Sequence, residues 1–164
     1  MRTALSTERL ELRLCTAGDL EELHAIFSDP ASNSIGDGPF ASTSETSSWI
    51  ARRQLRWEQT GLVWYAVRLR STGELVGNAG STPGRTGEKT PELGYLIAAN
   101  HRRRHYALEA ARAVLTEMLH EYTRVYATIR PANLPSISIV GQLGVRLERT
   151  EHDRKGPLQY YVHD

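Results

Sequence analysis

One stretch of the chain repeats its apolar residues at the spacing of an amphipathic helix over several turns. Directly before it, residues 91–98 alternate between two faces, which is typical of a strand. The amphipathic stretch is the clearest helix that the sequence predicts. The apolar positions of this helix are Ala107, Ala110, Ala111, Val114, Leu115, Met118 and Leu119.

Length, charge and cysteine content restrict the class of protein. The 164 residues fall within the roughly 100 to 200 residues of a single domain. The formal net charge is +1, from 20 basic and 19 acidic side chains, so attraction of the whole molecule to nucleic acid or membrane is not expected. Without an apolar run of signal-peptide or bilayer-spanning length, we expect a cytoplasmic protein. Cys15 is the single cysteine, which leaves no disulfide within the chain, and we expect it to pack inertly.

The N-terminal segment predicts a strand and a short helix. Residues 10–14 alternate leucines with charged side chains, as a half-buried strand does. Thr16 and Asp19 have the spacing of a capping box, and apolar residues then recur at helical spacing as far as Phe27.

Turn-forming residues fill the next segment, 30–42, and predict a loop of the kind that often borders a ligand site. Ser42 and Glu45 form a second capping box, which opens a helix that Gly61 ends. The many arginines of this helix are expected to face solvent or substrate.

Alternating apolar residues predict a hairpin formed by residues 63–69 and 75–81, joined by a Ser-Thr-Gly turn. A connection rich in proline and glycine then leads to the strand at 91–98. After the long helix, residues 125–129 predict a fifth strand. A further helix begins at Asn133 and ends at Gly144, and a closing hairpin pairs residues 146–150 with 159–162.

The resulting order of elements resembles the GNAT superfamily of acyl-CoA-dependent N-acyltransferases over essentially the whole chain. Three blocks at the family's spacing make the resemblance specific: Glu-Leu-Gly-Tyr at 92–95, the basic block and helix start at 102–110, and Asn-Leu-Pro-Ser with its helix at 133–144. The pattern is most similar to the enzymes that acetylate alanine or serine at the N-termini of ribosomal proteins.

This resemblance implies an α/β (α+β) fold with a mixed, mostly antiparallel central sheet of about six to seven strands and about four flanking helices. Residues 1–164 would form one GNAT domain. The implied activity is transfer of an acetyl group from acetyl-CoA to a primary amine, of a protein N-terminus or a small molecule, directly within a ternary complex. No metal is implied, and the protein would be a monomer or homodimer.

In this family the strand with the Glu-Leu-Gly-Tyr block splays from its neighbour, and the pantetheine arm pairs with the exposed backbone. The resemblance assigns that role to Leu96, Ile97 and Ala98, and a contact with the cofactor arm to Asn133. For Asn133, the alternative is the role of a helix N-cap, and both roles are compatible.

The phosphate loop of the family reads Arg or Gln, two residues, Gly, one residue, then Gly or Ala before a helix, where backbone N–H groups meet the pyrophosphate. His105 stands here at the glycine position, and Arg103 replaces another common glycine. The arginines would add charge-assisted contacts to phosphate, whereas the alternative is a solvated helix cap. The whole block is Arg102, Arg103, Arg104, His105, Tyr106 and Ala107.

Acyl transfer to an amine needs a neutral nucleophile and a proton for the leaving thiolate. By resemblance, Glu92 would take the amine proton through water, and Ser136 would give a proton to the thiolate. Their alternative roles are a strand-edge charge and a first-turn hydroxyl. An α-amine needs only about 1.4 kcal/mol of help at neutral pH, so a modest base suits it better than a lysine amine. Tyr95 and Tyr126 are expected to pack as core or wall.

Two other functions stay open at this point. The chain could be a non-catalytic acyl-CoA-binding or regulatory module, because His105 occupies the glycine position. Nucleic-acid binding through residues 102–104 is less favoured, because one short basic patch without aromatic platforms makes few phosphate contacts. The six histidines include no metal-binding spacing, which predicts metal-free chemistry.

Overall fold

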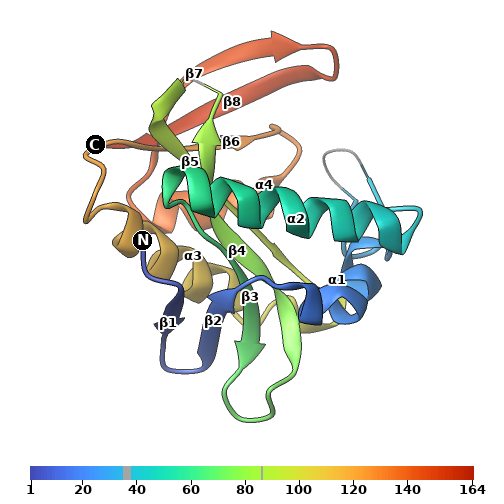
Figure 1. Ribbon diagram of the computed structural model, residues 1–164. Coiled ribbons are helices and arrows are strands. Elements are labelled where there is room, and N and C mark those ends of the chain that lie inside the picture. The colour runs from blue at the N-terminus through green and yellow to red at the C-terminus, as the bar shows by residue number, and fades with distance from the viewer. Residues whose placement is uncertain (35–37, 86) are drawn as a thin grey trace.

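The computed structural model of the protein describes residues 1–34, 38–85 and 87–164 (Figure 1). Its centre is an eight-stranded sheet in the order β1-β2-β3-β4-β5-β6-β8-β7. The strands are β1 Ala4–Ser6, β2 Leu10–Leu14, β3 Trp64–Leu69, β4 Leu75–Gly84, β5 Gly87–Ile97, β6 Val125–Ile129, β7 Arg146–Asp153 and β8 Gly156–His163. The helices are α1 Leu20–Phe27, α2 Thr43–Thr60, α3 Tyr106–Met118 and α4 Leu134–Gln142.

Local sequence signals place most of these elements correctly. The Asp19 carboxylate accepts a hydrogen bond from the Thr16 N–H at 2.9 Å, as a capping box requires, and a short 3-10 turn leads into α1. Helix α2 begins after its Ser42 cap and ends at Gly61, whose φ of 73° is readily adopted by glycine. Residues 35–37 of the expected loop at 30–42 lie outside the described residues.

The sheet differs from the expectation in two places. A short strand, β1, precedes β2, so the sheet has eight strands rather than six or seven. The expected Pro/Gly-rich connection after Ser81 is largely strand, because β4 and β5 continue toward each other and Pro83 lies opposite Pro91. Proline removes one N–H donor but leaves the extended backbone intact, so the ladder continues past both residues.

Each face of the sheet packs against its own helices. Helix α3 contributes Ala110, Val114 and Met118 to the larger buried cluster, together with apolar residues of β2 to β6. Helices α1 and α2 cover the other face through a second buried cluster, and α2 lies across the sheet (Figure 1). No helix in the described residues combines the length and apolar character needed to cross a bilayer.

Strands β5 and β6 meet at one point and then diverge. They are the parallel pair of the sheet, and their recorded pairing is Glu92 opposite Tyr126. All other neighbouring pairs of described strands are antiparallel. The sheet is therefore split beyond Glu92, where the carboxyl end of β5 borders a cavity instead of a full ladder.

Candidate active site

The first cavity lies at the split between β5 and β6 and has a volume of about 510 Å³. It is walled by the end of β5, the starts of α3 and α4, and the loop after α1. Its lining includes six of the residues predicted from sequence: Leu96, Ile97, Arg102, Ala107, Asn133 and Ser136. We call this the donor cavity, because the family resemblance of the sequence leads us to expect the acyl donor here.

The loop that opens α3 has the backbone shape of a glycine-rich turn without its glycines. Arg103 and His105 have φ of 64° and 63°, in the left-handed region that side chains with a Cβ rarely enter. His105 is the N-cap of α3 and makes no capping hydrogen bond with its side chain. The two substitutions therefore keep the turn and add the exposed side chains of Arg103 and His105 on either side of the exposed Arg104.

Two other members of the block are tied to the rest of the fold. Arg102 donates from Nη2 to the carbonyl oxygen of Ser32 at 2.6 Å, so its guanidinium links this loop to the one after α1. Tyr106 is half-buried under the guanidinium of Arg9, 4.7 Å from the ring centre. Ala98 is buried, and its N–H donates to Val76 in β4 rather than toward the donor cavity.

Asn133 and Ser136 form the first turn of α4. The side chain of Asn133 accepts from the Ser136 N–H at 3.3 Å, which confirms its role as an N-cap. The Tyr95 hydroxyl donates to the carbonyl oxygen of Ser136 at 3.3 Å, and burial raises the pKa of Tyr95 to about 12. Tyr95 is thus a protonated wall residue of the donor cavity, whereas Tyr126 is buried away from it and donates to Glu148.

Glu92 lies at the point where β5 and β6 meet. Its carboxylate accepts a hydrogen bond from the Thr128 hydroxyl and lies 3.9 Å from Nε of Arg85. The side chain is 15% exposed. Glu92 is not among the described residues that line the donor cavity or the second cavity.

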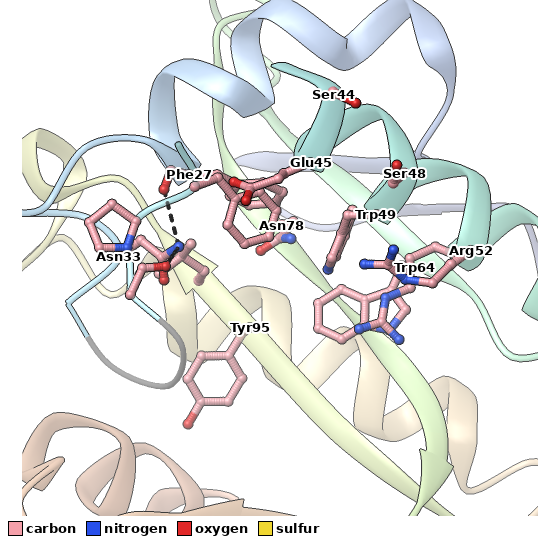
Figure 2. A pocket seen from close by; sticks show the side chains of 15 residues that line it. Phe27, Asn33, Ser44, Glu45, Ser48, Trp49, Arg52, Trp64, Asn78 and Tyr95 are labelled. Atoms are coloured by element: carbon pink, nitrogen blue, oxygen red, sulfur yellow. Dashed lines mark hydrogen bonds between the residues drawn. The ribbon is translucent and has the colours of Figure 1, made fainter. Parts of the chain in front are cut away.

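A second cavity, of about 720 Å³, opens on the α2 side of the same strand (Figure 2). We call it the acceptor cavity. Its aromatic wall is a chain of edge-to-face contacts from Phe40 to Phe27, Trp49 and Trp64, with ring centres 5.0 to 5.5 Å apart. Asn33, Tyr95 and Leu96 line both cavities.

Two glycines allow Trp64 to lie flat on the sheet. A Cβ at Gly80 would be 2.5 Å from the Trp64 Cα, and one at Gly94 would be 2.8 Å from the edge of the indole. Gly94 belongs to the Glu-Leu-Gly-Tyr block, so its small size leaves space for the wall of the acceptor cavity.

Apart from Tyr95 and Leu96, which line both cavities, the residues of the acceptor cavity were not predicted individually from the sequence. The arginines of α2 were expected to face solvent or substrate, and Arg52 and Arg53 do line this cavity. Asn78 is 2% exposed, and a polar side chain within an apolar strand is the signal that could have revealed it. Nothing local in the sequence indicates which side of the sheet Trp64 covers.

Cys15 is fully buried, as expected of a packing residue, and burial raises the pKa of its thiol well above the usual range. Its thiolate is therefore not available as a nucleophile at neutral pH. Within the ranges that the structure describes, no three His, Cys, Asp or Glu side chains are grouped as metal ligands.

Known proteins share both the sequence pattern and this architecture. Residues 9–146 match the family model described as an acetyltransferase (GNAT) domain. The Bacillus subtilis protein YkkB is 29% identical over 98% of this chain and 95% of its own. A putative GnaT-family acetyltransferase from Bordetella pertussis is 23% identical with a TM-score of 0.87, covering 99% of this chain and 100% of that one. RimL, a ribosomal L7/L12 alpha-N-protein acetyltransferase in complex with coenzyme A, is 16% identical with a TM-score of 0.84. The match covers 98% of this chain and 97% of RimL.

Proposed function

Because the chain belongs to the GNAT acetyltransferase family, we propose that it transfers the acetyl group of acetyl-CoA to a primary amine, of a protein N-terminus or a small molecule. The observation that carries this proposal is that the two cavities share Tyr95 and Leu96. Reactants that enter from opposite sides would meet at one strand, which gives the orientation that direct transfer requires. The burial of Cys15 agrees with transfer that has no acyl-enzyme step.

The donor cavity suits an acyl-CoA. Its phosphates would lie at the N-terminus of α3, where backbone N–H groups and the exposed Arg103 and Arg104 favour negative charge. The pantetheine arm would follow the free edge of β5. Since the N–H of Ala98 is used within the sheet, the alternation of the strand leaves Tyr95 and the N–H of Ile97 to face the arm, while the Ile97 carbonyl oxygen accepts from Nε of Arg102 at 3.4 Å.

Two residues of this chain would move protons. Glu92 takes the ammonium proton of the acceptor through water, and Thr128 and Arg85 hold its carboxylate in place. The neutral amine then forms the C–N bond while the C–S bond of the thioester breaks. Ser136, whose carbonyl oxygen accepts from the Tyr95 hydroxyl, would give its hydroxyl proton to the leaving thiolate and regain one from the nitrogen, which loses it as the amide forms.

An acceptor screen tests this function. The purified protein is incubated with acetyl-CoA and a panel of N-terminal peptides and small amines, and products are identified by mass spectrometry. We expect one class of acceptor to be acetylated. We also expect no acetylated enzyme to form before the acceptor is added. Binding of acetyl-CoA by calorimetry without any acetylation would instead identify a non-catalytic cofactor-binding module. Absence of both would contradict the proposal.

A further inference from the structure

Arginines in the acceptor cavity differ from most others in the protein. Arg52 and Arg53 line this cavity, and neither has a carboxylate within 4.0 Å among the described residues. The arginines elsewhere that form ion pairs with Asp or Glu are Arg2, Arg9, Arg13, Arg68, Arg85, Arg124, Arg130, Arg146 and Arg149. The cavity therefore holds two guanidinium groups without a contacting carboxylate among the described residues, although Glu92 acts on Arg53 from a greater distance.

Arg53 is fixed in place rather than free to reach solvent. Its guanidinium lies between two indoles, 5.1 Å from the ring centre of Trp49 and 4.8 Å from that of Trp64. Its Nη1 donates to the Thr82 hydroxyl at 3.1 Å, and its Nε is buried without a partner. Burial, and then the neighbouring Arg52, lower the pKa of Arg53 to about 10, so it remains charged at neutral pH. The Arg53 guanidinium is thus fixed in position but still has N–H groups without an acceptor. Such a group favours the binding of an anion.

The opposite end of the cavity accepts hydrogen bonds. Asn78 is buried, and its Oδ1 has no partner among the described residues. It lies opposite Leu96 in the ladder, next to the donor cavity. Glu45 also lines the acceptor cavity, and its Oε2 accepts from the Ala41 N–H at 2.6 Å.

These groups are separated along one cavity. Figure 2 shows Glu45 and Asn78 on one side of Trp49 and Arg52 on the other. Glu45 and Arg52 belong to the same helix, where their positions differ by about 10 Å along the axis. The cavity is thus negative or carbonyl-lined at the end near the donor site and positive at the far end.

We infer that the acceptor carries an anionic group on the same molecule as its amine. This inference rests on the proposed function. The amine would lie at Glu45 and Asn78, where a transferred acetyl group arrives, and a carboxylate or phosphate would bind Arg52 and Arg53. Glu92 pairs with Thr82 in the ladder, nearer the arginines, so the ammonium proton would reach it along water in the cavity. A diamine of the same length would place its second ammonium against these arginines and be disfavoured.

Charge-matched acceptors of increasing chain length test this inference. For each length, an ω-amino acid, the neutral n-alkylamine and the α,ω-diamine are compared by kcat/KM with acetyl-CoA. At the best length we expect the amino acid to exceed the neutral amine by about ten-fold or more, since one charged hydrogen bond is worth about that factor, and the diamine to be the poorest. Equal rates within a set, or a preference for the diamine, would overturn the inference.

Substitutions of the cavity arginines test whether they cause the preference for ω-amino acids. R52Q is expected to remove most of the preference, because Arg52 is exposed and its loss leaves the packing of α2 unchanged. R56Q is the matched control, since Arg56 is exposed on the same helix but outside the lining of the cavity. R53K keeps the positive charge but loses the paired N–H donors of the guanidinium. It should weaken the preference for the anionic acceptor without abolishing it. A preference that survives R52Q and R53Q together would assign it elsewhere and contradict the inference.

Product binding gives a readout independent of turnover. Titration with N-acetyl ω-amino acids and the matching N-alkylacetamides, followed by indole fluorescence of Trp49 and Trp64, should show tighter binding of the acids in wild type and in R56Q. Equal binding would reject the anionic acceptor even in an active enzyme. Tighter binding of the acids with no acetylation of any amine would retain the anion site and reject the proposed function.

A second arm separates the sources of such an anion. N-terminal peptides with glutamate or lysine at their second and third positions are compared with the free ω-amino acids. Acetylation of the glutamate peptides alone would identify an acidic protein N-terminus, and acetylation of the free compounds alone a small molecule. Preference for lysine peptides would contradict the inference.

Discussion

The two cavities on either side of β5 are built in different ways. The donor cavity takes most of its lining from two short stretches of chain, residues 95–107 and 132–139, and relies on backbone conformation at the starts of two helices. The acceptor cavity gathers side chains from α2, β3, β4, β5 and the segment near Phe40. A site made by local backbone shape can be recognised from a short block of sequence, whereas one made by side chains from several elements depends on how they pack.

Loss of the proposed base should have the largest effect on catalysis. In E92Q the amide cannot accept the ammonium proton, so we expect turnover to fall by about 100-fold below pH 8, where an α-amine is largely protonated, and by much less above it. A pH profile of kcat/KM measures this, with unfolding midpoints as the control for stability. A loss of the same size at every pH would contradict the role of base and indicate orientation of the acceptor.

Removal of one phosphate-loop charge should affect the donor cavity alone. R104A should weaken acetyl-CoA binding about ten-fold, because a charged hydrogen bond is lost, and the wild-type affinity should itself fall with salt. Calorimetry measures the effect. Arg154, exposed in the β7–β8 turn, provides a control of equal charge in R154A. Equal weakening in both variants would point to general electrostatics instead of a phosphate contact.

Filling the space under Trp64 should impair binding in the acceptor cavity and leave the donor cavity unaffected. In G94A the new methyl group would be 2.8 Å from the indole, so the ring must shift, at a cost of about 1–3 kcal/mol in the free energy of unfolding. We expect the KM for the acceptor to rise while acetyl-CoA affinity is retained. Denaturant melts and steady-state kinetics test this, and an equal loss for both substrates would show that the cavities are not independent.

Glycine at the left-handed N-cap should produce the smallest change. H105G relieves a side chain with φ of 63° and should raise the free energy of unfolding by about 0.5–1 kcal/mol, while H105A should give no such gain. Acetyl-CoA binding should be unchanged or tighter. Urea midpoints measure the change in stability, and calorimetry measures acetyl-CoA binding. A loss of affinity in H105G would show that the imidazole itself contacts the cofactor.

The same contrast explains what the sequence could predict. The periodicity of residues 107–119 and the three family blocks were sufficient for the fold, and six of the residues predicted to bind the cofactor or act on it line one cavity. The extension of β4 and β5 past Pro83 and Pro91 was missed, because their pairing is a property of the ladder and not of either segment. The position of Trp64 depends on its register opposite Gly80, and periodicity alone does not fix register between strands.

The contact between Arg102 and the carbonyl oxygen of Ser32 has a consequence for the order in which substrates associate. Asn33, the next residue, lines both cavities. A phosphate at the start of α3 would compete with that carbonyl for the guanidinium and so alter the loop that borders the amine. The affinities of the two substrates would then be thermodynamically linked, each changing the other by the same factor.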